Sequence, residues 1–250
     1  MLGLVLWATG CGRPTPDENQ SAPAGSQTRP IAEETSAAPP GQFPSADVLA
    51  TPTPPDIDGD LDDPAWKNKH LKGAMLNVYT SKVAQIQSRI YVTYDDKNVY
   101  VAFDMFEPYV DGMAAHLTDA VSDRDGYVWE DDSVEIFLDP NNGQLGKASY
   151  YHVAVNFKNV IYDEEVKDKF KDRRWNAPIR SAVKVGANSW TAEVVIPLAS
   201  MGAQGSPKGQ AWLANFCRNR QVTGATEDTS WSDVGEEFHA WQRYGHITFK

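Results

Sequence analysis

The sequence predicts an all-β fold, an antiparallel β-sandwich of the jelly-roll or immunoglobulin-like type with a few short helical turns. Three observations lead to this prediction. From position 88 onward, apolar and polar residues alternate in many short segments, which is the side-chain period of a half-buried strand. Turn-forming residues separate these segments. The sequence shows neither a long amphipathic helix nor a strand–helix–strand rhythm.

The first clear strand pair is a hairpin. Residues 90–94 and 99–106 are rich in aromatic and β-branched residues, and the polar run 95–98 lies between them. A run of this kind is typical of a four-residue hairpin loop. The next segment, 107–126, is acidic and irregular. We therefore expect it to form a loop that folds over one sheet.

Residues 129–139 form the most informative segment. Val134, Ile136 and Leu138 should face the core, while Glu135 and Phe137 should point to the opposite, exposed face. A carboxylate beside aromatic rings combines a hydrogen-bond acceptor with flat apolar surface. Sugars need both, because they carry hydroxyl groups and C–H faces.

The remaining strands follow from the same alternation. Residues 181–185 and 190–196 predict a second hairpin across 186–189, and residues 198–201 after Pro197 predict one helical turn. Further strands are expected at residues 150–157, 210–219 and 246–249.

The N-terminal part of the chain is not expected to join this fold. Residues 1–11 form a short apolar run that ends at Cys11, which is typical of the end of a bacterial lipoprotein signal, with Cys11 as the lipidated residue. Residues 12–55 contain ten of the 16 prolines and predict a disordered tether, so the folded domain is expected to span 56–250. The protein is therefore predicted to be lipid-anchored in a bacterial cell envelope, at the outer membrane or cell surface.

The net charge limits the classes of binding partner, and the cysteine content limits the disulfides that can form. The formal net charge of −11 argues against nucleic acid, and against a membrane contact other than the lipid anchor. If Cys11 carries lipid, Cys217 has no disulfide partner. Cys217 lies in an apolar segment and is expected to be a small buried hydrophobe.

Metal sites receive little support from the sequence. Residues 56–63 are acidic, but Leu61 and Lys67 stand where an EF-hand loop requires Gly and Glu. A polar turn anchored by a buried Trp66 is preferred, and a structural calcium ion of another kind stays open. The five histidines show no zinc-ligand spacing.

Two kinds of residue could act on a carbohydrate. Trp129 and Trp231 lie in polar contexts and could be platforms for a sugar ring, whereas Trp190 and Trp212 lie within strands and are expected in the core. A glycoside hydrolase would need two carboxylates. The sequence offers four for that alternative: Asp131, Asp132, Glu135 and Glu193.

Five motifs in order resemble one family. They are 57–66, the segment 129–139, the strand 190–197 ending in Ile-Pro, the stretch 212–218 with 230–232, and 238–247 with Phe238-His239 and Tyr244-Gly245. Together they resemble the family 9 carbohydrate-binding modules and their relatives, and the resemblance covers essentially residues 56–250.

The resemblance implies a non-catalytic β-sandwich that binds plant-type polysaccharides such as xylan or cellulose, in proteins that often also carry a polysaccharide-degrading enzyme. Its sugar contacts would fall on residues matching the family pattern, which are Trp129, Glu135, Trp231, Asn215, Arg218 and Asn156. A related branch of these sandwiches holds haem b, which leaves an electron-transfer domain as an alternative. Met105, Met113 or His152 would then be the axial ligands.

Overall fold

The computed structural model describes residues 43–203, 205–222, 224 and 226–250. Cys11, the predicted signal segment and residues 12–42 of the predicted tether lie outside the described residues. Within them, no helix is both long and apolar enough to cross a membrane.

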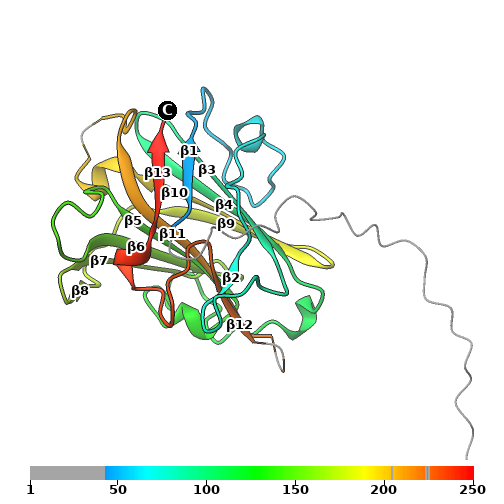
Figure 1. Cartoon of the computed structure of the whole chain (residues 1–250). Helices are drawn as coiled ribbons and strands as arrows, with labels where there is room; N and C mark the ends of the chain where they lie inside the picture. Colours follow the sequence, from blue (N-terminus) through cyan, green and yellow to red (C-terminus); the bar gives the residue numbers. More distant parts are fainter. Residues whose placement is uncertain (1–42, 204, 223, 225) are drawn as a thin grey trace, which may run out of the picture. The chain divides into compact units, whose positions relative to one another are not determined.

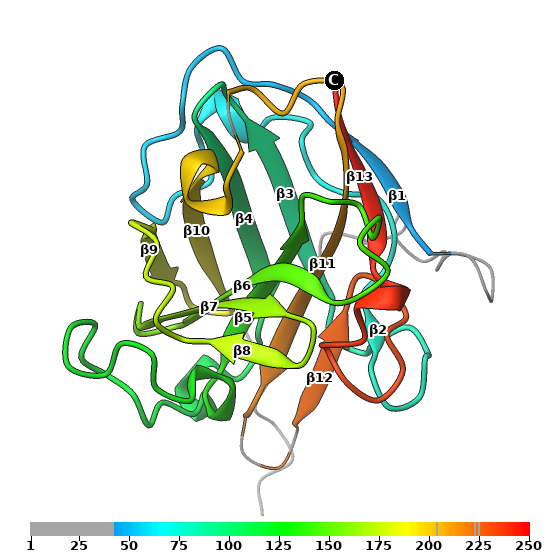
Figure 2. The same cartoon turned by 90° about the vertical axis from the view of Figure 1, so that its left-hand side faces the viewer.

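Two β-sheets pack face to face, as Figures 1 and 2 show. All strand pairs are antiparallel except β1 with β13. The nine-stranded sheet has the order β1-β13-β11-β5-β6-β7-β8, with β12 joining β11 to β2. Its strands are β1 (Ser45–Val48), β2 (Leu76–Asn77), β5 (Ser133–Asp139), β6 (Ser149–Asn156), β7 (Ile161–Lys167), β8 (Phe170–Asp172), β11 (Ala211–Arg220), β12 (Glu227–Ser230) and β13 (Gly245–Phe249).

The second sheet has four strands in the order β3-β4-β10-β9. They are β3 (Ser88–Tyr94), β4 (Asn98–Phe106), β9 (Arg180–Val185) and β10 (Ser189–Pro197). Five short 3-10 turns complete the described secondary structure: η1 (Pro64–Trp66), η2 (Val110–Gly112), η3 (Val128–Glu130), η4 (Leu198–Met201) and η5 (Trp241–Arg243). The predicted all-β sandwich with few helical turns is therefore confirmed.

The main core lies between the sheets. Val134, Ile136 and Leu138 of β5 point into it, as their alternation predicts, and meet apolar side chains of the four-stranded sheet. Trp190 and Trp212 are buried there as expected. Both predicted hairpins are present, because β3 pairs with β4 and β9 with β10. The turn at Leu198–Met201 also forms.

The folded domain begins earlier than the sequence suggested. β1 lies within the predicted tether, yet it pairs in parallel with β13, with Val48 opposite Phe249. The predicted start of the domain at position 56 was therefore wrong, because the many prolines of residues 12–55 were interpreted as a disordered tether. The prolines around β1 need not interrupt it, since this strand pairs on one side only, at the edge of the sheet.

Four other strands, β2, β7, β8 and β12, were not anticipated. β7 is the most consequential, and its sequence is Ile-Tyr-Asp-Glu-Glu-Val-Lys. Three consecutive acids hide the alternation that marks a strand. They are tolerated because each carboxylate has a hydrogen-bonding or ionic partner. On the inner face, Arg124 pairs with Asp163 at 2.5 Å, and on the outer face Tyr162 donates a hydrogen bond to Glu164.

The outer face of the nine-stranded sheet is covered rather than exposed. Phe137, Tyr150 and Leu213 pack there against Val234 and Tyr244, which follow β12. This second apolar cluster also buries Cys217, as its sequence context predicted. Glu135 was expected to be exposed, but only 3% of its surface is accessible, because this segment folds over it.

The acidic loop at 107–126 folds over the same face, as expected. Asp131 accepts hydrogen bonds from the backbone N–H groups of His116 and Leu117, and Asp132 accepts one from Ala114. Leu117 packs against Tyr162 of β7 and its neighbours. Two carboxylates thus fix the path of the loop.

A buried ion triad joins the two sheets. Glu107 directly follows β4, and its carboxylate meets Arg218 Nη2 at 2.8 Å and Arg220 Nε at 2.6 Å, both from β11. Arg218 Nη1 also donates to the Phe106 carbonyl at 2.9 Å. Burial alone would raise the pKa of Glu107, but the two arginines outweigh that effect and lower it.

The triad gives a stability prediction. Glu107→Gln removes the carboxylate that is bonded to two buried guanidinium groups, so we expect the free energy of unfolding to fall by about 3 to 5 kcal/mol. Urea unfolding followed by circular dichroism measures this loss. The matched control is Glu130→Gln, at an exposed position. It should change stability by no more than about 0.5 kcal/mol, and equal effects of the two variants would contradict the assignment.

Candidate functional site

A cavity of about 330 Å³ opens on the outer face of the nine-stranded sheet. Its floor is built from four strands, with Glu135 from β5, His152 from β6, Tyr162 and Glu164 from β7, and Asn219 from β11. The register places these side chains together. His152 lies directly opposite Glu164 on one side and opposite Phe137 on the other.

Aromatic side chains form part of the wall. Trp129 of η3 is partly buried and packs edge-on against Tyr162, with ring centroids 5.1 Å apart. Arg173 lies over the rings of Tyr127 and Tyr162, at 5.3 Å from each centroid. Tyr79 is 66% exposed and also lines the cavity. Flat apolar surfaces therefore stand beside the polar floor.

Asp228 of β12 adds a hydrogen-bond acceptor to the cavity lining. Its Oδ2 accepts a hydrogen bond of 3.0 Å from the Tyr79 hydroxyl. Its Oδ1 is buried and meets no hydrogen-bond partner among the described residues. Burial raises the pKa of this carboxyl. A ligand hydroxyl entering the cavity could satisfy this oxygen.

At the centre of the floor, the ring of His152 lies between two carboxylates. Its Nδ1 is 3.2 Å from Glu164 Oε1, and its Nε2 is 2.7 Å from Glu135 Oε2. The second contact is a buried ion pair. The ring also stacks on Phe137, with centroids 4.3 Å apart. His152 is therefore held by charge and by stacking.

The protonation states follow from this arrangement. Burial alone would lower the pKa of His152, but hydrogen bonding and charge from Glu135 and Glu164 raise it. Burial alone would raise the pKa of Glu164, but hydrogen bonds from His152 and Tyr162 lower it to about 2. The pKa of Glu135 is lowered in the same way, against its burial, by His152 and by Asn219, whose amide donates to Oε1 at 2.6 Å. These shifts favour an imidazolium between two carboxylates.

His239 closes the cavity from the segment between β12 and η5. Burial, together with the positive charges of His152 and Lys171, lowers its pKa to about 3, so the ring is neutral. Lys171 can only donate, so Nε2 of His239 accepts its hydrogen bond of 3.0 Å. Nδ1 then carries the proton and donates to the Tyr150 hydroxyl at 2.7 Å.

Of the six predicted ligand residues, the structure places two in this cavity, Trp129 and Glu135. Trp231 does not line it. This residue is only 3% exposed, lies in the main core and donates its indole N–H to the Lys72 carbonyl. The predicted second platform was therefore wrong at this position, because a polar sequence context does not reveal burial.

The other three predicted contacts are buried structural residues. The Asn156 amide donates to Asp131 and to the Leu117 carbonyl, holding the acidic loop. Asn215 bonds Ser230, and Arg218 belongs to the ion triad. None of the three lines the cavity.

The alternatives from the sequence do not converge on one site. Of the four carboxylates considered for glycosidase chemistry, only Glu135 reaches the cavity. Asp131 and Asp132 hold the loop, and Glu193 lies on the four-stranded sheet, where it binds Trp66 Nε1 at 2.7 Å. The buried Trp66 confirms the predicted anchor of the polar turn. Met105 lies in the core between the sheets and Met113 packs against that core, and neither lines the cavity with His152 as a second axial ligand.

Sequence reasoning missed several residues of the cavity. Asn219 lies two residues after Cys217 in a predicted strand, so the alternation of that strand could have placed both side chains on the outer face. His239 lies in one of the family-like motifs, but the sequence did not indicate which residues surround it. Glu164 and Asp228 lie on strands that were not predicted, and Tyr79 lies beyond the short β2.

A scan of protein-family models matches residues 57–250 to a family described as carbohydrate family 9 binding domain-like. The chain belongs to this family. A search of the curated proteins found no match.

Similar solved structures include family 9 modules. A module from Caldicellulosiruptor kristjanssonii in complex with cellotriose is 20% identical, with a TM-score of 0.58, over 82% of this chain and 93% of that one. A structure of a family 9 module from the same organism with glucose is also 20% identical, with a TM-score of 0.55, over 82% and 95% of the two chains. A structure from Bacteroides uniformis is 16% identical, with a TM-score of 0.61, over 84% and 100%. These similarities establish the β-sandwich fold.

Asp132 gives a pH prediction for the loop beside the cavity. Burial raises the pKa of its carboxyl from 3.8 to about 6. The folded state therefore binds this proton more tightly than the unfolded state does. The stabilisation that the bound proton supplies is complete below about pH 4 and is lost as the pH rises through about 6.

Asp132→Asn removes this titration and keeps an oxygen for Ala114. We expect the free energy of unfolding of the variant, relative to wild type, to rise by on the order of 2 kcal/mol between those pH values. Urea unfolding at both ends of the range measures the change. Asp111→Asn, on the exposed surface, should follow the wild-type curve. A difference that does not vary with pH would contradict the assignment.

Proposed function

We propose that the chain binds a carbohydrate in the cavity on the outer face of the nine-stranded sheet, without cleaving it. One observation carries the proposal. In a member of a carbohydrate-binding family, aromatic rings of Trp129 and Tyr79 flank the fixed hydrogen-bonding groups Glu135, Asn219 and Asp228. Rings can stack on the C–H faces of a sugar while oriented polar groups bind its hydroxyls.

Plant-type polysaccharides are the ligand class that we propose, with cellulose, a chain of glucose, first and xylan, a chain of xylose, second. Family membership supports a carbohydrate ligand. The complexes of family 9 modules with cellotriose and glucose support a ligand that is built from glucose. The cavity volume of about 330 Å³ fits one or two sugar rings rather than a long chain.

The carboxylates favour binding over hydrolysis. Both oxygens of Glu135 are engaged, by Asn219 and His152, and both oxygens of Glu164 are engaged, by His152 and Tyr162. A glycosidase needs one carboxylic acid with a raised pKa, whereas the pKa of Glu135 and of Glu164 is lowered. Of Glu135, Glu164 and Asp228, the raised pKa belongs to Asp228, which accepts a hydrogen bond from the Tyr79 hydroxyl. Glu135 and Glu164 suit acceptance of hydroxyl protons rather than donation.

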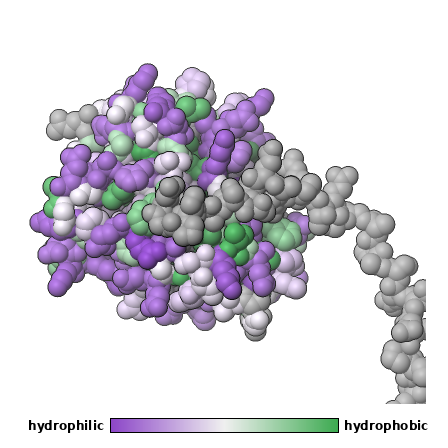
Figure 3. Space-filling view, in the orientation of Figure 1, coloured by the Kyte–Doolittle hydropathy of each residue, from purple (hydrophilic) through white to green (hydrophobic). Residues whose placement is uncertain are grey.

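We further propose that the domain is held at a bacterial cell envelope by lipid on Cys11, with residues 12–42 as the spacer, and that it acts beside polysaccharide-degrading enzymes. The sequence around Cys11 supports the anchor. Figure 3 shows a face dominated by hydrophilic residues with scattered apolar ones, which fits a domain suspended in water. The acidic charge disfavours nucleic acid as a partner.

The aromatic wall gives the binding prediction. Trp129→Ala should weaken binding of cello-oligosaccharides at least about tenfold, because loss of a stacking ring costs more than about 1.4 kcal/mol. Isothermal titration calorimetry measures the affinity. Trp231→Phe is the matched control, since it changes a buried tryptophan outside the cavity. It should lower thermal stability while the folded protein keeps its affinity.

Two outcomes would contradict the proposal. Wild-type protein that binds neither cello- nor xylo-oligosaccharides would exclude the ligand class. Release of reducing sugar from these chains, abolished by Glu135→Gln, would instead establish a glycosidase.

A further inference from the structure

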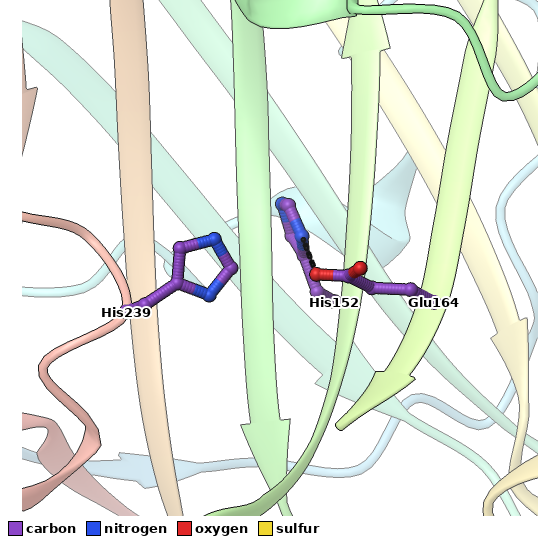
Figure 4. A group of neighbouring side chains, drawn as sticks. All are labelled: His152, Glu164 and His239. Atoms are coloured by element: carbon purple, nitrogen blue, oxygen red, sulfur yellow. Dashed lines mark hydrogen bonds and ion pairs between the residues drawn. The ribbon is translucent and has the colours of Figure 1, made fainter. Parts of the chain in front are cut away.

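Three side chains on the cavity floor form a group that the proposed sugar contacts do not explain. His152, Glu164 and His239 each offer one ligand atom, and these atoms lie within 4.8 Å of one another. Figure 4 shows the His239 ring facing His152 and Glu164. The group draws on two strands and one loop, and it lines the cavity.

Each of the three side chains also contacts a different neighbour through the polar atom that points away from the group. Tyr162 donates to Glu164 Oε2 at 2.6 Å, Tyr150 bonds His239 Nδ1 at 2.7 Å, and Glu135 pairs with His152 Nε2 at 2.7 Å. The atoms that face one another are Oε1 of Glu164, Nε2 of His239 and Nδ1 of His152, and their present contacts are the Nδ1–Oε1 pair and the bond from Lys171 to Nε2. Outer hydrogen bonds of this kind orient metal-binding residues and fix their tautomers.

The spacing suits a small ion. Donor atoms around a tetrahedral zinc ion lie about 3.3 Å apart, given bond lengths of about 2.0 to 2.2 Å. His152 Nδ1 and Glu164 Oε1 are already 3.2 Å apart and belong to directly paired strand residues. His239 lies in a turn between β12 and η5, so a shift of about 1.5 Å would bring it within the ligand distances.

A cation of the chain already occupies the entrance to this group. Lys171 Nζ lies 3.0 Å from His239 Nε2 and 4.0 Å from Glu164 Oε1. Its side chain is 48% exposed, so the flexible stem can carry the ammonium group out into water. Two of the three donors thus already face one positive charge.

We propose that His152, Glu164 and His239 bind one divalent first-row transition metal ion, of which Zn²⁺ is the best match, with Lys171 displaced and the Nδ1 proton of His152 released to water. Two imidazole nitrogens and one carboxylate oxygen favour such an ion over Ca²⁺ or Mg²⁺, which prefer oxygen ligands. Three protein ligands leave a position of a four-coordinate ion free. Because the donors line the cavity, that position is accessible to water or to a ligand oxygen.

Calorimetric titration of the metal-stripped protein with zinc chloride tests the site in the absence of sugar. We expect one ion per chain, and an affinity at least tenfold lower in His239→Gln and in Glu164→Gln. The matched control is His246→Gln, an exposed histidine whose contact is Asn142. It should leave zinc binding unchanged, and calcium and magnesium should give no comparable heat.

Lys171→Met provides a second test that does not risk the fold, because this residue is half exposed. Removal of the competing ammonium should tighten zinc binding, whereas a purely structural cluster would show no such gain. Absence of stoichiometric binding would overturn the proposal. So would binding that survives His239→Gln and is indifferent to Lys171→Met. Because no sugar is present, either result leaves the carbohydrate proposal to its own test.

Discussion

The alternation of side chains along β5, β6, β7 and β11 is the constraint on which both the core and the cavity depend. Successive residues of a strand point to opposite faces. Val134 and Ile136 therefore enter the main core, while Glu135 between them enters the cavity floor. A slip of one residue would exchange the two faces. The cavity floor and the hydrophobic core are thus set by one register.

The burial of charge sets the character of the cavity. The carboxylates of Glu135 and Glu164 balance the positive charge of His152, and all three side chains are nearly inaccessible to water. Such a group is stable only while each charge keeps its partners. The hydrogen-bond acceptors beside Trp129 are therefore held in fixed directions before any ligand arrives. Preorganisation of this kind lowers the entropy lost on binding.

Several residues that resemble ligand contacts are instead used to build the scaffold. Arg218 and Glu107 join the sheets, and Asn156, Asp131 and Asp132 hold the loop that packs behind Trp129 and Tyr162. These polar groups lie close to the site but make their contacts within the protein. Polar residues gathered in one part of a sequence therefore do not distinguish ligand contacts from supports. The distinction depends on which atoms remain accessible.

The sequence by itself determined the sandwich, both hairpins, the inner face of β5, and the presence of Trp129 and Glu135 on one surface. Local alternation and turn chemistry encode these features, because each depends on residues close in the chain. Only the tertiary structure decided that Trp231 is buried, that β1 belongs to the sheet, and that His239 meets His152 and Glu164. Those outcomes depend on how distant segments pack. No local pattern carries that information, and the acids of β7 conceal even the strand that brings Glu164 to the site.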